Sequence, residues 1–93
     1  MAEKQTATDG EFISVKVCFF AGAREQVGID QTQLQLATGS GTPAFVDALV
    51  GRYPQLSTLL PRCALAINGD YVRSETLLAA GDEVAVLPPM SGG

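Results

Sequence analysis

The feature that most constrains the fold of this chain is a short apolar run that stops at two prolines. Residues 84–87, Val-Ala-Val-Leu, are apolar at every position, which is typical of a strand buried on both faces of a sheet. Pro88 and Pro89 cannot continue a sheet, because proline lacks the N–H donor and has a fixed φ. We therefore expect a strand in the middle of a sheet that ends abruptly, with the chain leaving it in extended form.

The residues after this strand form a short tail, Pro88-Pro89-Met90-Ser91-Gly92-Gly93. Glycine has no Cβ, so the end of the tail is thin and can adopt backbone angles that are closed to other residues. Such a tail presents the α-carboxylate of Gly93 and suits a carrier whose terminus must reach into the active site of another protein. The alternative is a frayed end, the usual state of a terminus.

The remaining apolar patterns predict further strands. Alternation of apolar and polar residues, or a short apolar run, predicts strands at positions 13–20, 31–36, 63–67 and 71–72. Asn68 and Gly69 tolerate positive φ, so they are expected to turn the chain between the last two of these strands. Residues 21–28 are expected to form a turn or a single helical turn that Gly28 closes.

One stretch has the pattern of a longer helix. Thr42 is expected to be its N-cap and Pro43 its first helical residue. The apolar residues that follow recur on one helical face: Phe45, Val46, Leu49, Val50 and Tyr53. The helix must end near Tyr53, because Pro54 cannot continue it. Further leucines are expected to close the end of the core or to anchor a loop: Leu56, Leu59, Leu60, Leu77 and Leu78.

This order of elements predicts an α+β protein with the ubiquitin-like β-grasp fold. We expect a mixed sheet of about five strands with one main helix on one face, because the helix makes the crossover that parallel strands require. The first and last strands are the natural central neighbours. The chain then divides into a flexible N-terminal extension at 1–11, a β-grasp domain at 12–87 and an extended tail at 88–93.

Composition excludes several classes of function. The chain of 93 residues allows one domain, and its net charge of −4, without a cluster of Lys or Arg, argues against nucleic-acid binding. It has no histidine, the commonest general base and metal ligand at neutral pH, so no metal site is expected. Residues 1–11 lack a secretory signal and no segment is long enough to span a membrane, which predicts a cytosolic protein. Cys18 and Cys63 are expected to be buried thiols rather than a disulfide.

Three stretches give the chain a specific likeness. They are Val17–Gly28 (VCFFAGAREQVG), Ala66–Gly69 (AING) and Leu78–Gly93 (LAAGDEVAVLPPMSGG). The sequence resembles the small subunit of molybdopterin synthase, a sulfur-carrier family with a ubiquitin-like fold. The likeness covers residues 13–93 in the right order. The chain departs from the family pattern in the polar extension 1–11, in Cys18 and in Leu87, where an aliphatic and an aromatic residue, respectively, are more usual.

The resemblance implies a specific chemistry for the tail. An E1-like adenylyltransferase and sulfurtransferase would use ATP to adenylate the carboxylate of Gly93 and convert it to a thiocarboxylate. The tail, from Pro88 through Gly92, would then thread into the large subunit of the synthase. There the sulfur would attack cyclic pyranopterin monophosphate to form the dithiolene of molybdopterin.

The resemblance also implies the partners. Two small and two large subunits would form a heterotetramer, with the active site in the large subunit, and the small subunit would bind no permanent cofactor. Phe20, Leu87 and Arg24 are the candidate contacts to the partner. Core packing is the alternative for Phe20 and Leu87, and a solvated turn is the alternative for Arg24.

Three other functions remain open. A sulfur carrier for thiamine synthesis or transfer-RNA thiolation has the same fold and Gly-Gly end, although the double proline and the FFAGARE run argue against it. A ubiquitin-like modifier, joined to lysines of other proteins, would be activated in the same way. A β-grasp interaction module would have an inert terminus.

Overall fold

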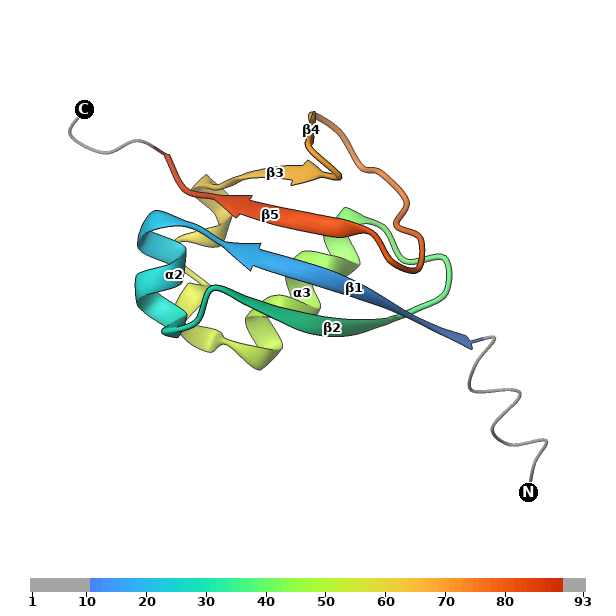
Figure 1. Ribbon diagram of the computed structural model, residues 1–93, viewed down its shortest axis with the longest axis horizontal. Coiled ribbons are helices and arrows are strands. Elements are labelled where there is room, and N and C mark those ends of the chain that lie inside the picture. The colour runs from blue at the N-terminus through green and yellow to red at the C-terminus, as the bar shows by residue number, and fades with distance from the viewer. Residues whose placement is uncertain (1–10, 90–93) are drawn as a thin grey trace, which may run out of the picture.

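The apolar run near the C-terminus forms strand β5 (Glu83–Leu87), and β5 is the middle strand of a five-stranded sheet. The computed structural model describes residues 11–89, and residues 1–10 and 90–93 lie outside this range. The sheet has the order β2-β1-β5-β3-β4 (Figure 1). The other strands are β1 (Phe12–Phe19), β2 (Gln31–Ala37), β3 (Ala64–Ile67) and β4 (Asp70–Val72).

The first and last strands are neighbours, as expected. β1 and β5 are parallel, with Val17 opposite Val84 and Phe19 opposite Val86. β2 is antiparallel to β1, and β3 is antiparallel to both β4 and β5. The sheet is therefore mixed, and the predicted α+β class and β-grasp arrangement are confirmed.

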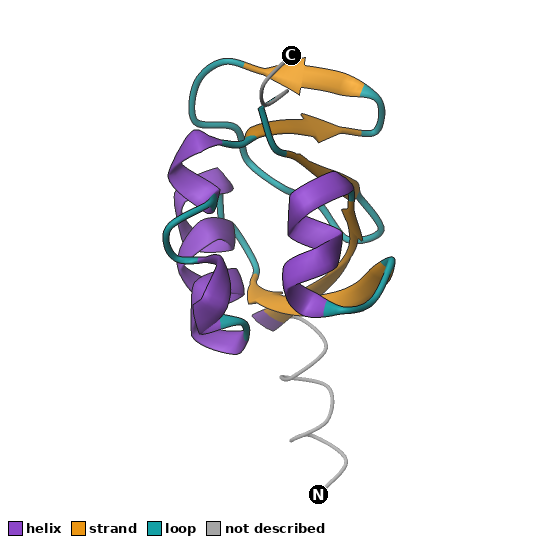
Figure 2. Ribbon diagram, turned by 90° about the vertical axis from the view of Figure 1, so that its left-hand side faces the viewer, coloured by secondary structure: helices purple, strands orange, loops and turns teal. Residues whose placement is uncertain are grey.

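The helices cover one face of the sheet (Figure 2). The main helix is α3 (Thr42–Arg52), and two 3-10 turns, η1 (Pro54–Leu56) and η2 (Leu60–Arg62), follow it. Residues that we expected to form a turn or single helical turn form a second helix, α2 (Ala21–Val27), of about two turns. Gly28 closes α2 as predicted: it has φ 82°, and its N–H donates to Arg24 O at 2.7 Å.

The start of α3 differs from the prediction. Gly41, not Thr42, is the N-cap residue. The Thr42 side chain is buried, and its Oγ1 accepts a hydrogen bond from Thr76 N at 3.3 Å, while Thr42 N donates to Thr76 O at 3.0 Å. The hydroxyl therefore ties the loop before β5 to the helix instead of capping it. The end of the helix at Arg52 agrees with the expectation that Pro54 stops it.

The core lies between the sheet and the helices. The fully buried side chains with the largest volumes come from both layers: Phe19, Phe45, Leu49, Leu56, Val15, Val17, Val84 and Val86. Leu60 and Leu78 are also buried, whereas Leu77 is 75% exposed, so only one residue of the Leu77–Leu78 pair anchors its loop. The ring of Tyr53 packs edge-on against Phe19, with centroids 5.7 Å apart.

The prediction that β5 is buried on both faces was wrong. Val84 and Val86 are fully buried beneath the helices, but Ala85 and Leu87 are only half-buried. In the described part of the chain, all helices lie on the core side of the sheet, so the opposite side of β5 has no covering layer. Burial on both faces therefore does not explain why every residue from Val84 to Leu87 is apolar.

The turn between β3 and β4 agrees with its prediction. Asn68 and Gly69 have φ values of 52° and 91°. The Asn68 side chain also joins this turn to the start of β5: its Nδ2 donates to Asp82 Oδ1 at 2.9 Å, and its Oδ1 accepts from Glu83 N at 3.0 Å. The second Asp82 oxygen accepts from Ala79 N at 2.8 Å. These bonds hold the hairpin against the strand that leads to the tail.

Candidate functional site

The side of the sheet without helices carries a band of small and apolar side chains. Strand register aligns Cys18, Ala85, Ala66 and Tyr71 across β1, β5, β3 and β4, and it places Leu87 opposite Ala64. Alternation along each strand turns these residues away from the core. We call this surface the outer face, defined by Cys18, Ala66, Tyr71, Ala85 and Leu87. Tyr71 is 68% exposed, Cys18, Ala85 and Leu87 are half-buried, and Ala66 is buried.

The tail leaves the sheet at one end of the outer face. Leu87 is the last residue of β5, Pro88 is half-buried and Pro89 is exposed. Phe20 directly follows β1, and 47% of its surface is exposed. Because β1 and β5 are parallel, Phe20 and Leu87 lie at the same end of the sheet. The structure thus brings both predicted apolar contact residues to the point where the tail departs.

A local change in the backbone lies next to Phe20. Phe20 is extended, with φ −127° and ψ 154°, but Ala21 has φ 48°, in the left-handed region that residues other than glycine rarely occupy. The chain then enters α2, and Phe20 O accepts hydrogen bonds from Ala23 N at 3.0 Å and Arg24 N at 3.3 Å. Alternation along β1 already turns Phe20 away from the buried row of Val15, Val17 and Phe19, and this turn ends the strand just before Phe20.

Arg24 occupies the exposed side of α2. Its Nη1 lies 3.5 Å from Asp30 Oδ1, and the two side chains are 57% and 78% exposed. A solvated pair of this kind contributes little to stability. Arg24 therefore has a partner in its own chain, and its predicted contact with another protein stays a prediction. Gly93, Gly92, Ser91 and Met90 lie outside the described residues.

The two thiols are free, as predicted, but the expectation that they are buried was wrong, because both are only half-buried. Burial raises the pKa of the Cys18 thiol, and its hydrogen bond to Glu83 Oε2 at 3.2 Å raises this pKa further. Burial also raises the pKa of Cys63, which Arg62 lowers in part. Both shifts disfavour the thiolate, so neither cysteine is activated as a nucleophile.

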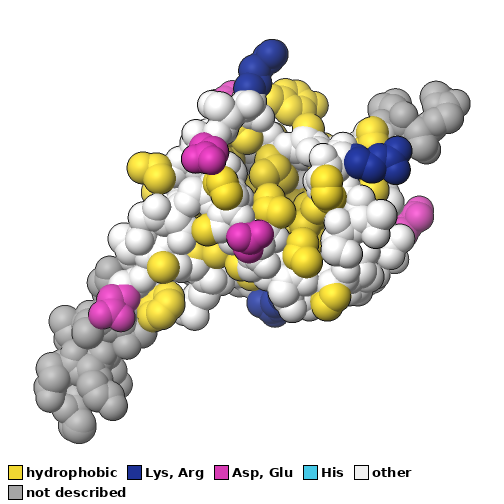
Figure 3. All heavy atoms as spheres, turned by 180° about the vertical axis from the view of Figure 1, so that it is seen from behind, with side chains coloured by type: hydrophobic (Ala, Val, Ile, Leu, Met, Phe, Trp, Pro, Cys, Tyr) yellow, Lys and Arg dark blue, Asp and Glu magenta, His cyan; other side chains and the backbone are white. Residues whose placement is uncertain are grey.

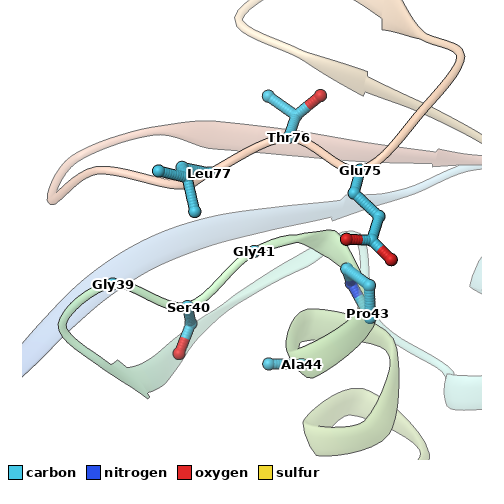
Figure 4. A pocket seen from close by; sticks show the side chains of 8 residues that line it. All are labelled: Gly39, Ser40, Gly41, Pro43, Ala44, Glu75, Thr76 and Leu77. Carbon is cyan, nitrogen blue, oxygen red and sulfur yellow. The ribbon is translucent and has the colours of Figure 1, made fainter.

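One pocket lies away from the tail. It has a volume of about 440 Å³ and is formed by the loop before α3 and the loop after β4 (Figure 4). Its lining residues are Gly39, Ser40, Gly41, Pro43, Ala44, Glu75, Thr76 and Leu77. Glu75, which lies beside Pro43 in Figure 4, is the one ionisable residue among them. The pocket therefore offers no acid–base pair.

Residues 11–89 contain neither a metal-binding cluster nor a membrane-spanning helix. In this range, no group of three or more His, Cys, Asp or Glu side chains could hold a metal ion. No helix in the same range is long and apolar enough to cross a membrane. The side of the molecule opposite the outer face also shows hydrophobic side chains near its middle, with charged side chains among and around them (Figure 3).

The sequence pattern did not single out Tyr71 as a candidate contact residue. It was assigned to a short strand, but the pairing of that strand decides which face an aromatic ring occupies. The register Ala66–Tyr71 puts it in the row of Cys18 and Ala85. An exposed aromatic residue two positions after an Asn-Gly turn was the available signal.

These features define a ubiquitin-like β-grasp protein with an open apolar sheet face beside the exit of its C-terminal tail. The model of the ThiS family matches residues 17–93, and the chain belongs to this family.

Relatives and solved structures agree with this assignment. The molybdopterin synthase sulfur carrier subunit of Chlamydomonas reinhardtii is 35% identical over 83 residues, covering 87% of this chain and all of that protein. The subunit of the same name from Arabidopsis thaliana is 34% identical over 90 residues, covering 97% and 94%. These matches confirm the resemblance inferred from the sequence motifs.

Two solved structures have the same fold. The small archaeal modifier protein 1 of Methanosarcina acetivorans superimposes with a TM-score of 0.76 at 30% identity, over 90% of this chain and all of that one. A complex of subunits 1 and 2 of the molybdopterin-converting factor of Helicobacter pylori contains a chain that matches with a TM-score of 0.64 at 26% identity. This match covers 87% of the present chain and all of that one.

Proposed function

We propose that this protein is the sulfur carrier subunit of a molybdopterin synthase and acts in the synthesis of the molybdenum cofactor. The observation that carries the proposal is the abrupt end of β5 at Pro88 and Pro89, beside the exposed Phe20 and the open outer face. A docking face next to a departing tail suits a protein that delivers its own terminus to a partner. The names of the relatives, molybdopterin synthase sulfur carrier subunits, give the carried atom as sulfur.

The chemistry is proposed to take place at Gly93. A carboxylate is a poor acyl donor, so an activating enzyme joins it to AMP from ATP and releases pyrophosphate. The terminal sulfur of a persulfide then attacks the acyl carbon, and AMP leaves. Cleavage of the resulting acyl disulfide by a thiol releases the Gly93 thiocarboxylate. Its sulfur is ionised and nucleophilic at neutral pH, for the reason that thiolates rather than thiols attack.

The receiving active site belongs to a large subunit in this scheme. The tail enters that subunit, its sulfur attacks cyclic pyranopterin monophosphate, and hydrolysis of the acyl–sulfur bond restores the Gly93 carboxylate. Two loaded carriers in turn supply the two sulfurs of the dithiolene. The outer face, together with Phe20, is the proposed contact, because the exposed side chains of Tyr71 and Phe20 gain most from being covered. Two small and two large subunits are proposed to assemble in the cytosol. ATP is consumed by the activating enzyme and is not held by the carrier.

The test is the intact mass of the chain after incubation with a matched activating enzyme, ATP and a sulfur donor. A carrier gains the mass difference between sulfur and oxygen, and alkylation with iodoacetamide should then map to Gly93. A fused C-terminal tag that cannot be cleaved should abolish the gain, whereas an N-terminal tag should not. Full product formation from the C-terminal fusion would contradict the carrier proposal.

A second function has support from one specific likeness. The match to small archaeal modifier protein 1 favours a protein modifier that is joined to the lysines of other proteins. The same incubation, with other cell proteins present, separates the two. Ligation of the chain to a second protein marks a modifier, and a thiocarboxylate without ligation marks a carrier. An unchanged mass would leave only an inert interaction module.

The narrowness of the tail has its own test. If the tail threads a tight tunnel, Gly92→Ala should slow dithiolene formation from a carrier that already bears the thiocarboxylate, because a rigid wall cannot accommodate an added Cβ. Starting from loaded carrier removes the activating enzyme from the assay. An unchanged rate would assign the two glycines to recognition by that enzyme instead.

A further inference from the structure

Strand β2 forms one edge of the sheet and is unusually open for an edge strand. It pairs with β1 alone and is seven residues long, Gln31–Ala37. Its sequence, QTQLQLA, contains neither a charged residue nor a proline. Soluble proteins usually protect such an edge with charges, prolines or a covering element, because its free backbone groups can pair with another strand.

The register shows which backbone groups of β2 are free to pair. Phe19 N donates to Asp30 O at 2.7 Å, and Thr38 N donates to Glu11 O at 2.8 Å. In an antiparallel ladder, alternate residues turn their N–H and C=O groups to the same neighbour. Residues 30 and 38 therefore face β1, along with the even-numbered residues between them. Gln31, Gln33 and Gln35 turn their backbone groups outward.

Arg52 closes the middle of this outward row. Its Nη1 donates to Gln33 O at 3.0 Å, from the last turn of α3. The guanidinium carbon lies 5.7 Å from the centroid of the Tyr53 ring, and Tyr53 packs against Phe19 in the core. The guanidinium is thus held in place by a neighbour that is itself fixed. The guanidinium of Arg52 occupies the Gln33 carbonyl oxygen, with which an added strand would need to pair at its centre.

We propose that the free edge of β2 is a pairing surface for β2 of a second copy of this chain, and that Arg52 keeps this edge closed in the monomer. A two-fold axis at Gln33 would pair Gln33 with its own copy, and Gln31 with Gln35 of the other chain. Each outward N–H and C=O of these residues then meets a complementary group. The glutamine side chains would oppose one another as amides, which donate and accept equally.

The absence of charge makes a second copy the fitting occupant. The whole chain carries a net charge of −4, which keeps copies apart in general. β2 is a stretch without charge, so this repulsion is weakest where the edge is open. An edge of glutamines is also complementary to itself, whereas a charged partner strand would find no opposite charge within β2.

The test removes the cap without touching β2. Arg52→Ala should convert the monomer to a species of twice the mass in size-exclusion chromatography with light scattering, at protein concentrations of hundreds of micromolar. Arg52→Met should do the same while retaining the apolar stem over Tyr53, which guards against a loss of folding in the first variant. Arg62→Ala is the matched control, because it removes another exposed cation elsewhere, and it should stay monomeric.

A second substitution tests the pairing register. Gln33→Glu places a carboxylate opposite Lys16, its neighbour on β1, and a carboxylate oxygen can accept the hydrogen bond that Ser14 Oγ now donates to Gln33 Oε1 at 2.9 Å. The fold should therefore be retained. In the proposed dimer, the two introduced glutamates would face each other and repel. Adding Gln33→Glu to Arg52→Met should restore the monomer.

The outcomes decide the proposal in both directions. A doubling of mass in both Arg52 variants, reversed by Gln33→Glu, supports it. The proposal is overturned if folded Arg52→Met remains monomeric, if Arg62→Ala dimerises to the same extent, or if the dimer persists with Gln33→Glu. The experiment uses the isolated chain, so its failure says nothing against sulfur transfer.

Discussion

Truncation of Phe20 offers a sharp test of the proposed docking face, because the chain contains its own control. Phe20 and Phe12 are the same residue type at opposite ends of β1, and they are 47% and 45% exposed. Phe20 lies at the end from which the tail departs, and Phe12 lies at the other end. Replacing either by Ala removes the same atoms from a similarly exposed site, so the two variants should lose similar stability.

The expected effect on binding follows from the exposed area. A phenylalanine side chain can bury about 200 Å², of which the 47% exposure of Phe20 leaves about 90 Å² for a partner to cover. At about 25 cal/mol per Å², covering this area contributes about 2 kcal/mol. Phe20→Ala should therefore weaken binding to the large subunit about 30-fold. Phe12→Ala should leave the affinity within about 2-fold of the original.

The assay is titration calorimetry of each variant with the isolated large subunit, after circular dichroism has established equal folding. Tyr71→Ala should also weaken binding, since Tyr71 lies on the same face and is the most exposed of its large side chains. Equal affinities of the Phe20 and Phe12 variants would refute the reasoning, because the loss of binding would then not depend on which end of the sheet carries the substitution.

Three further predictions concern stability. Asn68→Gly should lower the free energy of unfolding by about 1 kcal/mol through the lost bonds to Asp82 and β5, and Asn68→Ala by about 2 kcal/mol, since alanine also strains the positive φ. Equal losses in urea denaturation would contradict a role for φ. Ala21→Gly should raise stability by about 0.5 kcal/mol, because relief of strain at φ 48° exceeds the added freedom of the unfolded chain, and a lower urea midpoint would argue against strain. The raised pKa values of Cys18 and Cys63 mean that folding favours the protonated thiols. Their contribution is complete below the ordinary pKa of 9.0 and is lost as pH rises through the folded-state values. Urea midpoints should therefore fall above this pH, and the fall should shrink in a variant with alanine at both positions.

The strands and the main helix could be predicted because their signals are local. Alternation in β1 and the proline after Tyr53 each act within a few residues. The central position of β5 also followed, since an apolar strand needs neighbours on both edges. The closeness of Phe20 and Leu87 depended on predicting that β1 and β5 are parallel neighbours.

Other features depend on contacts that the sequence does not contain. Thr42 has the residue type of an N-cap, but its hydroxyl oxygen accepts a hydrogen bond from the loop at Thr76 N instead. Nothing in the apolar run of β5 distinguishes a second buried face from a face open to a partner. Tyr71 and the contact between Arg52 and Gln33 depend on how distant segments align. Register and edge position are properties of the whole sheet.

The parallel pairing of β1 and β5 accounts for both parts of the proposed site. Parallel neighbours end at the same side of a sheet, so Phe20 after β1 and Pro88 after β5 are placed together, although they are far apart in sequence. The connection between parallel strands needs a crossover, and here α3 lies on one face. The described helices all fall on that side, which leaves the other face open. An antiparallel β5 would send the tail out at the end of Phe12 instead. The topology that stabilises the core thus also places the proposed docking face beside the departing tail.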